Sequence, residues 1–146
     1  SGNWFEVGTN FYEGIDRSKY WDGHLSLSLN DIDPNYWQIG IGFLEVYKNT
    51  FIIQGTPSPL EVKVGSGKQI YELFNFRMFV ENNPEKDWFR ELHEENDILS
   101  IALGNAVEGY VMLELIDTRL LQFEVFLNVE REEINDFTNQ SRTYER

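Results

Sequence analysis

The chain contains no cysteine and only two histidines, His24 and His93, among 146 residues. The missing thiols exclude disulfides, thiolate metal sites and cysteine nucleophiles, and they are compatible with a reducing compartment. No apolar run approaches the roughly 18 residues that a membrane helix needs, and no basic stretch precedes an apolar one at the N-terminus. These absences predict a cytoplasmic protein outside the membrane. Ser1-Gly2 is interpreted as a tag scar or as the start left by a cleaved leader.

Groups that could support catalysis are equally scarce. His24 falls on the polar side of an alternating segment and His93 in an acidic run, so both are predicted to be surface side chains. Asp31-Ile32-Asp33 lacks the glycine and the closing glutamate of a calcium loop, and turn formation explains it. Gly65-Ser66-Gly67-Lys68 lacks the upstream glycine of a phosphate loop. We therefore expect no enzyme, no metal and no cofactor.

Positive charge is also in short supply. Twelve Lys and Arg face 25 Asp and Glu, which gives a net charge of −13 and a pI near 4.4. Such a field repels phosphate backbones, so direct nucleic-acid binding is disfavoured, while encounter with a basic protein is accelerated. The alternative is that the acidity only maintains solubility.

What the sequence has in quantity is alternation of apolar and polar residues, which is typical of half-buried antiparallel strands. The turn dipeptide Gly104-Asn105 predicts a hairpin between the two segments that flank it. The predicted strands cover residues 24–30, 37–47, 50–54, 60–64, 69–81, 98–103, 106–117 and 119–129.

Two segments have helical signals. Asn83-Pro84-Glu85 offers an N-cap, a proline at the first helical position and an acid in the first turn, which predicts a helix over 84–95. A second helix is predicted over 130–142, with Ile134 and Phe137 as its apolar contacts. Residues 1–146 are thus expected to form a single acidic α+β domain, an antiparallel sheet or open barrel with about two helices packed on it.

Acidic residues are interleaved with aromatic ones in the first third of the chain. Tyr and Trp anchor protein interfaces, and carboxylates select basic partners. The alternative is that these aromatic side chains belong to the core. The predicted partner-binding residues are Asp22, Asp31, Asp33, Tyr36 and Glu45.

The segment Tyr20-Trp21-Asp22-Gly23-His24-Leu25-Ser26-Leu27, together with the patterns at 121–129 and 132–142, resembles the WapI-type immunity proteins of bacterial toxin systems. The resemblance implies a small acidic cytosolic α+β protein that binds and neutralises a cognate toxin domain, often a basic nuclease. It would do so by covering the active site of the toxin or a neighbouring surface.

Two other functions remain open. Strands that curve around an apolar pocket would make a small-ligand-binding or structural module, and an enzyme would need convergent carboxylates in a cleft. The pocket predicted for the first of these is lined by Trp37, Phe43, Phe74, Phe76 and Phe123.

Overall fold

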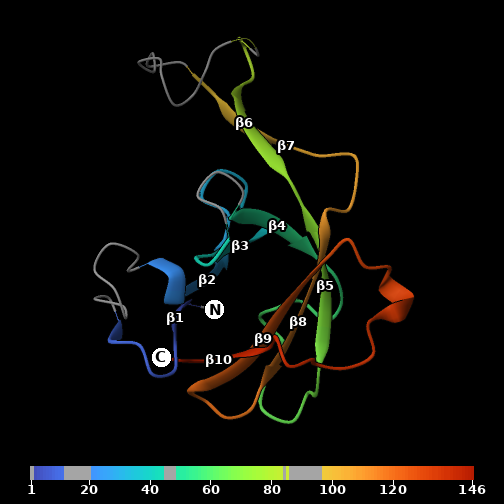
Figure 1. Ribbon diagram of the computed structural model, residues 1–146. Coiled ribbons are helices and arrows are strands. Elements are labelled where there is room, and N and C mark those ends of the chain that lie inside the picture. Colours follow the sequence, from blue (N-terminus) through green and yellow to red (C-terminus); the bar gives the residue numbers. More distant parts are fainter. Residues whose placement is uncertain (1, 12–20, 45–48, 84, 86–96) are drawn as a thin grey trace.

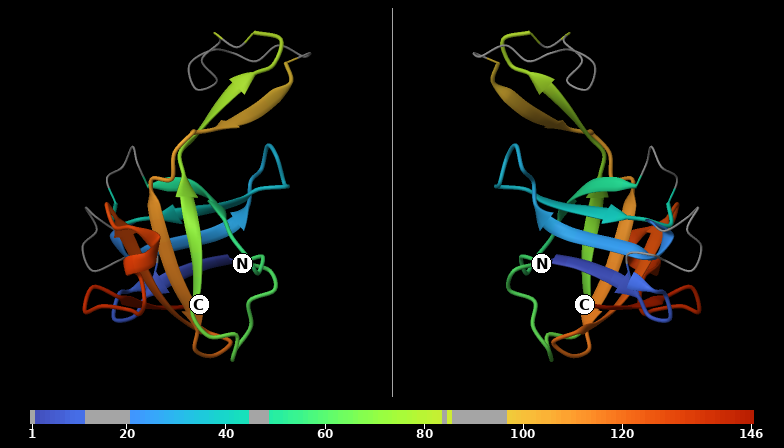
Figure 2. Two further views of the ribbon diagram at one scale, coloured as in Figure 1. Left: turned by 90° about the vertical axis from the view of Figure 1, so that its right-hand side faces the viewer. Right: turned by 90° about the vertical axis from the view of Figure 1, so that its left-hand side faces the viewer.

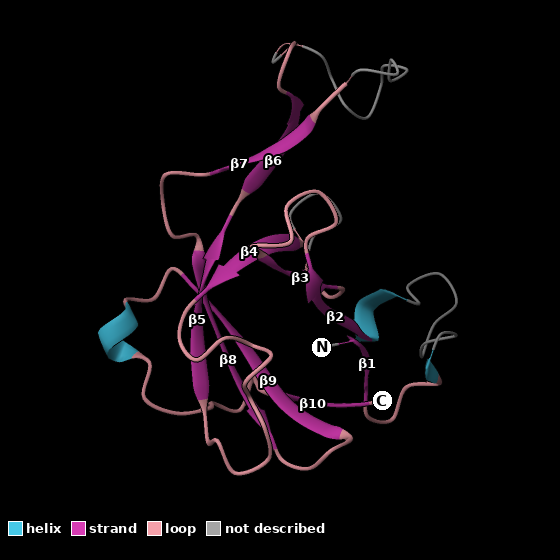
Figure 3. Cartoon of the chain, turned by 180° about the vertical axis from the view of Figure 1, so that it is seen from behind, coloured by secondary structure: helices cyan, strands magenta, loops and turns pink. Residues whose placement is uncertain are grey.

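The computed structural model describes residues 2–11, 21–44, 49–83, 85 and 97–146, and these form a closed antiparallel β-barrel (Figure 1). Figure 3 shows strands throughout the described chain, with short helical turns only at its edges. The predicted α+β class with two packed helices is therefore wrong. None of the helices in the described ranges is long and apolar enough to cross a membrane.

Eight strands close the barrel in the order β1-β10-β9-β8-β5-β4-β3-β2, and β6 and β7 form a separate two-stranded sheet. Every neighbouring pair is antiparallel. The strands are β1 (Gly2–Glu6), β2 (His24–Leu29), β3 (Trp37–Ile41), β4 (Thr50–Gln54), β5 (Gln69–Phe74), β6 (Phe76–Val80), β7 (Leu99–Leu103), β8 (Gly109–Leu115), β9 (Leu120–Leu127) and β10 (Arg142–Glu145).

Side chains fill the barrel, because eight strands leave an interior just wide enough for them. Successive residues of a strand point to opposite faces, so every second residue enters the core. Phe123 and Tyr144 meet edge to face there with ring centroids 5.9 Å apart, within the range of about 4.5 to 7 Å that is usual for such pairs. The core comprises Trp4, Leu25, Leu27, Ile39, Ile41, Phe51, Ile53, Tyr71, Leu73, Val111, Leu113, Leu121, Phe123 and Tyr144.

Most alternating segments are strands as predicted, but three details differ. Residues 60–64 form turns, with Val62 packed against the core at one end of the barrel. The segments around Gly104-Asn105 do not pair with each other, because β7 pairs with β6 while β8 pairs with β5 and β9. The predicted strand 37–47 ends at Ile41.

The β6–β7 hairpin forms an arm that stands away from the barrel in both views of Figure 2. The arm prolongs the β5–β8 pair, since β5 leads into β6 through Asn75 and β7 leads into β8 through the turn after Leu103. The Gly104 amide donates to the Asn75 carbonyl (2.7 Å) at this junction. The helix predicted over 84–95 lies outside the described residues, except for residue 85, which is in a turn.

The predicted C-terminal helix is replaced by a strap, residues 128–141, that lies over the outside of the barrel. Its one helical turn, Arg131–Glu133, has the capping box of a true helix start, but it stops at Ile134 in extended backbone. Ile134 is buried against Met112 and Phe126 on the outer face of β8 and β9. The residues that follow the strap form β10 instead of continuing a helix. This strand pairs with β9 and with β1 and so closes the barrel.

A buried carboxylate holds the strap in place. Glu124 is only 4% exposed, and it accepts hydrogen bonds from the Thr138 amide (2.7 Å) and the Thr138 hydroxyl. Farther along, Lys68 forms an ion pair with Asp136, which lowers the pKa of that carboxyl. The strap is therefore fastened by polar contacts at its edges and by apolar contacts below it.

Candidate functional site

The candidate site lies at the barrel end that holds the N-terminus, the β2–β3 turn and the β4–β5 loop. The turn is built around Asn30, a side chain only 4% exposed. Its Oδ1 accepts from the amides of Ile32 and Asp33, both at 2.9 Å, and its Nδ2 donates to Gln38 Oε1 at 2.7 Å. Asx turns of this kind fix loop geometry, so the residues that follow Asn30 are held in defined positions.

Next to this turn is a groove of about 590 Å³, here called the mouth groove. Its apolar lining comes from β2, β3 and the β4–β5 loop: Leu27, Leu29, Trp37 and Leu60. Leu29 is 45% exposed and Leu60 is 72% exposed. Exposed leucines around a concave surface are typical of binding sites, because burying them against a partner is favourable. The remaining lining residues are Gly2, Asn3, Ser28 and Ser58.

A second hollow, of about 330 Å³, lies on the other side of Trp37. Trp37 and Ser58 line both hollows, so the indole stands between them. Tyr36 joins the second hollow, which places two neighbouring aromatic residues at this end of the barrel. Tyrosine and tryptophan are enriched among residues that dominate binding energy in protein interfaces.

Acidic residues lie on the turn and the loop that adjoin these hollows. Asp31 is exposed, and Asp33 Oδ1 accepts from the Asn35 amide at 3.0 Å. On the β4–β5 loop, Glu61 Oε2 accepts from the Ser58 amide at 2.9 Å. The surface thus combines an apolar and aromatic centre with carboxylates at its edge, the arrangement of a typical protein interface.

Tyr71 is buried beneath the same loop, close to the negative charge of Glu61. The Tyr71 hydroxyl donates to the Pro57 carbonyl at 2.8 Å. Burial raises the pKa of Tyr71 to about 12, and the negative charge of Glu61 contributes to the rise. The hydroxyl therefore stays protonated and ties the loop to β5 at neutral pH.

Three of the five predicted partner-binding residues, Asp31, Asp33 and Tyr36, come together at this end of the barrel. Asp22 does not join them, because it lies in the turn before β2 and Asp31 lies after it. The six residues of β2 span about 17 Å, since a strand rises about 3.4 Å per residue. Glu45 lies outside the described residues.

The sequence-based prediction missed Leu29 and Leu60. Both occupy positions that alternation assigns to the buried side of a strand, and only the end of the barrel leaves them exposed. For Leu29 the signal would have been that β2 extends beyond its pairing with β1, which stops at Leu27. Leu60 lies in a turn instead of the predicted strand.

The five residues of the predicted apolar pocket do not form one pocket. Phe123 is fully buried in the core and Phe76 belongs to the arm. Phe43 stacks under the Arg142 guanidinium, 4.0 Å from its ring centroid. Only Trp37 reaches the mouth groove.

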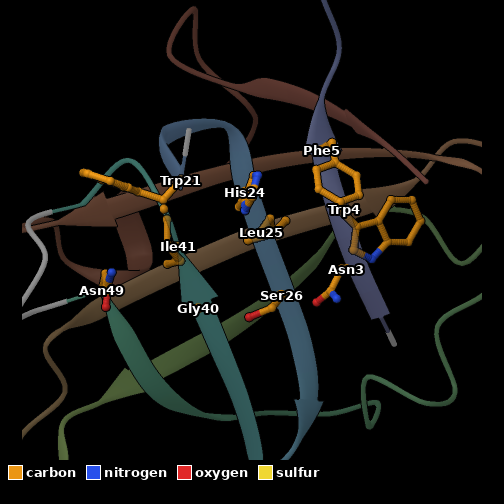
Figure 4. Close-up of a pocket in the computed structure, with 11 residues that line it drawn as sticks. Asn3, Trp4, Phe5, Trp21, His24, Leu25, Ser26, Gly40, Ile41 and Asn49 are labelled. Carbon is orange, nitrogen blue, oxygen red and sulfur yellow. The ribbon is translucent and has the colours of Figure 1, made fainter. Parts of the chain in front are cut away.

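A further groove, here called the side groove, lies on the outer wall of β1, β2 and β3 and encloses about 260 Å³ (Figure 4). Strand register places Asn3, Ser26 and Gly40 in one row across it, and Phe5 pairs with His24 in the next row. Trp21 and Asn49 lie at its edge in Figure 4. His24, predicted as a surface residue, is half-buried and meets the Phe5 ring edge to face at 5.1 Å.

Metal chemistry has no support in the described part of the chain, where no three His, Asp or Glu side chains gather in a group able to hold an ion. His93 lies outside that part. Comparison of the sequence and structure with protein-family models, with curated proteins and with solved structures gives no match.

Proposed function

We propose that this chain is a protein-binding module that captures a basic protein domain at the end of the barrel formed by the mouth groove, the second hollow and the β2–β3 turn. The observation that carries the proposal is that exposed leucines and Trp37 line the hollows, while the adjoining turn and loop carry Asp31, Asp33 and Glu61. The proposed function is inhibition by binding, without catalysis.

The apolar centre would supply most of the affinity. Leu60 and Leu29 expose side chains that lose contact with water when a partner covers them, at about 25 cal/mol for each Å² of apolar surface. Trp37 adds a rigid aromatic wall between two hollows, which suits the insertion of a partner side chain on either side.

The acidic edge would select the partner and accelerate its arrival. With a net charge of −13, the molecule attracts basic surfaces over distances of up to about a Debye length, which is longest at low salt. Asp31 and Asp33 project from a turn that Asn30 holds in place, so ordering them on binding costs little entropy.

The resemblance to WapI-type immunity proteins suggests which kind of basic partner to seek. We propose a bacterial toxin domain, for example a nuclease, which this chain neutralises in the cytoplasm. An acidic inhibitor can occupy the surface that such an enzyme offers to its anionic substrate, and the charge of this chain is compatible with that role.

The test is capture of partners by the immobilised protein from a lysate of its own organism, followed by quantitative mass spectrometry and affinity measurement with the purified partner. We expect Leu60→Asp to weaken binding by about tenfold or more, because it places a charge in the apolar centre. Asp31→Lys should weaken binding by about fivefold at low salt and much less at high salt.

Matched controls are available outside the proposed surface. Val107→Asp adds the same charge at a 38% exposed apolar residue of a turn by the arm, and Glu132→Lys reverses an exposed acid on the strap. Both controls should bind within about twofold of the unmodified protein. A partner that responds equally to the test variants and the controls, or a set of heterogeneous basic proteins released by salt, would contradict the proposal.

The volume of the mouth groove favours a second candidate function, the binding of a small apolar ligand. Its 590 Å³ falls within the range of about 300 to 1,000 Å³ that is usual for ligand pockets. Fluorescence titration with a medium-chain fatty acid, read as the part of the tryptophan emission that Trp37→Phe removes, tests this candidate. Saturable binding that Leu60→Asp abolishes would support it, and absence of binding would leave protein recognition as the function of the groove.

A further inference from the structure

The side groove differs from the mouth groove in its chemistry. It is smaller, at about 260 Å³, and none of its described lining residues is Asp, Glu, Lys or Arg, although the chain as a whole is strongly acidic. Apart from the His24 imidazole, a charged ligand would find no ionisable partner among the described lining residues. The volume is also below the usual range for drug-sized ligands, so the groove suits a single ring.

The floor of the side groove is formed where residues with short or no side chains lie opposite each other on paired strands. Ser26 of β2 lies between Asn3 of β1 and Gly40 of β3. A Cβ on Gly40 would lie 2.6 Å from the Ser26 hydroxyl oxygen, so the Ser26 side chain occupies the space beside Gly40 and a larger residue would not fit there. Figure 4 shows the Asn3 and Ser26 side chains beside each other on this floor.

Apart from the His24 imidazole, the polar groups of the groove are uncharged amides and a hydroxyl. The Asn3 and Asn49 amides each carry donors and an acceptor, the Ser26 hydroxyl does both, and the His24 imidazole adds a further ring nitrogen. Within the described residues, the side chains of Asn3 and Ser26 have no hydrogen-bonding protein partner, so both can serve a ligand.

Aromatic carbon supplies the rest of the lining. Phe5 is 7% exposed and is packed by Phe11 at 5.6 Å and His24 at 5.1 Å between ring centroids, which holds its ring in place. Trp21 is half-buried at the opposite side, as Figure 4 shows. Apolar walls beside neutral hydrogen-bonding groups match a ring that has an apolar face and hydroxyls at its edge.

We propose that the side groove binds one neutral monosaccharide unit, with Asn3, Ser26 and Asn49 bonding its hydroxyls and Trp21 covering its apolar face. Asn3 also lines the mouth groove, so this site adjoins the proposed protein-binding surface at that residue. A neutral planar heterocycle is the competing ligand. It would need a stacking partner on each face, and the Phe5 ring is already engaged by its neighbours.

The test is a titration of the full chain with glucose, galactose, N-acetylglucosamine and their methyl glycosides, with adenosine as the heterocycle. Binding is read from amide chemical shifts and from tryptophan fluorescence. We expect one or more sugars to give saturable shifts at Asn3, Ser26 and Gly40 with a dissociation constant in the millimolar range. Ser26→Val, which fills the floor, should weaken this binding at least about tenfold.

Ser28→Val is the matched control, because it makes the same change two residues along the same face of β2, outside the side groove. It should leave sugar binding unchanged. If Ser26→Val does not fold, Asn3→Ala at an exposed position replaces it and should weaken binding as well. Three outcomes would overturn the proposal: no saturable sugar shift, equal binding by the test and control variants, or binding of adenosine instead of sugars.

Discussion

Two tyrosines that enter the barrel interior differ in how their hydroxyls are satisfied. The Tyr71 hydroxyl donates to the Pro57 carbonyl, whereas the buried Tyr144 hydroxyl has no hydrogen-bond partner among the described residues. Burial raises the pKa of Tyr144 well above its usual value, the Glu6 carboxylate raises it further, and the Arg142 charge opposes both. An unsatisfied buried hydroxyl costs free energy, so the stabilising part of Tyr144 is its ring, which packs edge to face against Phe123.

These raised pKa values predict that the protein loses stability in alkaline solution. Unfolded tyrosine titrates near pH 10, and the folded Tyr71 titrates at about 12. The folded state therefore binds more protons than the unfolded state above pH 10. The stabilisation from this difference is complete below about pH 10 and is lost as the pH rises toward 12. Urea unfolding from about pH 8 to about pH 12 measures the loss.

Tyr144→Phe is the variant that isolates the effect. It removes a buried titrating hydroxyl without breaking a described hydrogen bond, so the free energy of unfolding should fall less steeply with pH than in the unmodified protein. At neutral pH the variant should be as stable or up to about 1 kcal/mol more stable. An unchanged alkaline slope would contradict the assignment.

Elements of this fold depend on one another to different degrees. The strands of the barrel each pair on both sides, whereas β6 and β7 pair only with each other among the described strands. A lone two-stranded hairpin is marginal in water. The barrel does not need the arm to close, because β5 and β8 already pair from Gln69 with Leu113 to Leu73 with Gly109.

We therefore expect the barrel to fold without its arm. A chain in which Asn-Gly replaces residues 75–107 joins Phe74 to Glu108 through a two-residue turn of the type that hairpins favour. It should keep one cooperative unfolding transition, with a smaller denaturant slope because less surface is exposed on unfolding. Amide spectra of the shortened chain, compared with the full one, would show the barrel resonances in place. Loss of cooperative unfolding would show that the arm is part of the folding unit.

The net charge of −13 on 146 residues affects the stability of the whole molecule. Like charges repel across the compact state and less so in the expanded unfolded chain, so the charge destabilises the fold. Salt shortens the Debye length from about 30 Å at 0.01 M to about 3 Å at 1 M and so screens this repulsion.

The melting temperature should consequently rise with added sodium chloride between about 0.01 M and about 0.5 M. Most of the increase should come at the low end of the range, where screening changes fastest. A titration with sucrose, which stabilises without screening, serves as the reference. A melting temperature that is flat or falls with salt would mean that local ion pairs outweigh the general repulsion.

Sequence pattern determined the strand content. Alternation identified the residues that became β2, β3, β6 and β9, because the period of two is a local property of an extended chain. It also placed Asp31, Asp33 and Tyr36 in or beside a turn, since Asn, Asp and Pro have local preferences that act without the rest of the fold.

Tertiary structure decided what the strands and the polar segments became. The capping box at Glu130 and Glu133 is a genuine helix signal, yet burial of Ile134 on the barrel and use of residues 142–145 as β10 outweigh it. Closure into a barrel and the partner of each strand are non-local choices, since hydrogen-bond pairing joins residues far apart in the sequence. The candidate sites could not be predicted from the sequence for the same reason. Leu29, Leu60 and Trp37, and likewise Asn3, Ser26 and Gly40, become neighbours only when separate strands come into register.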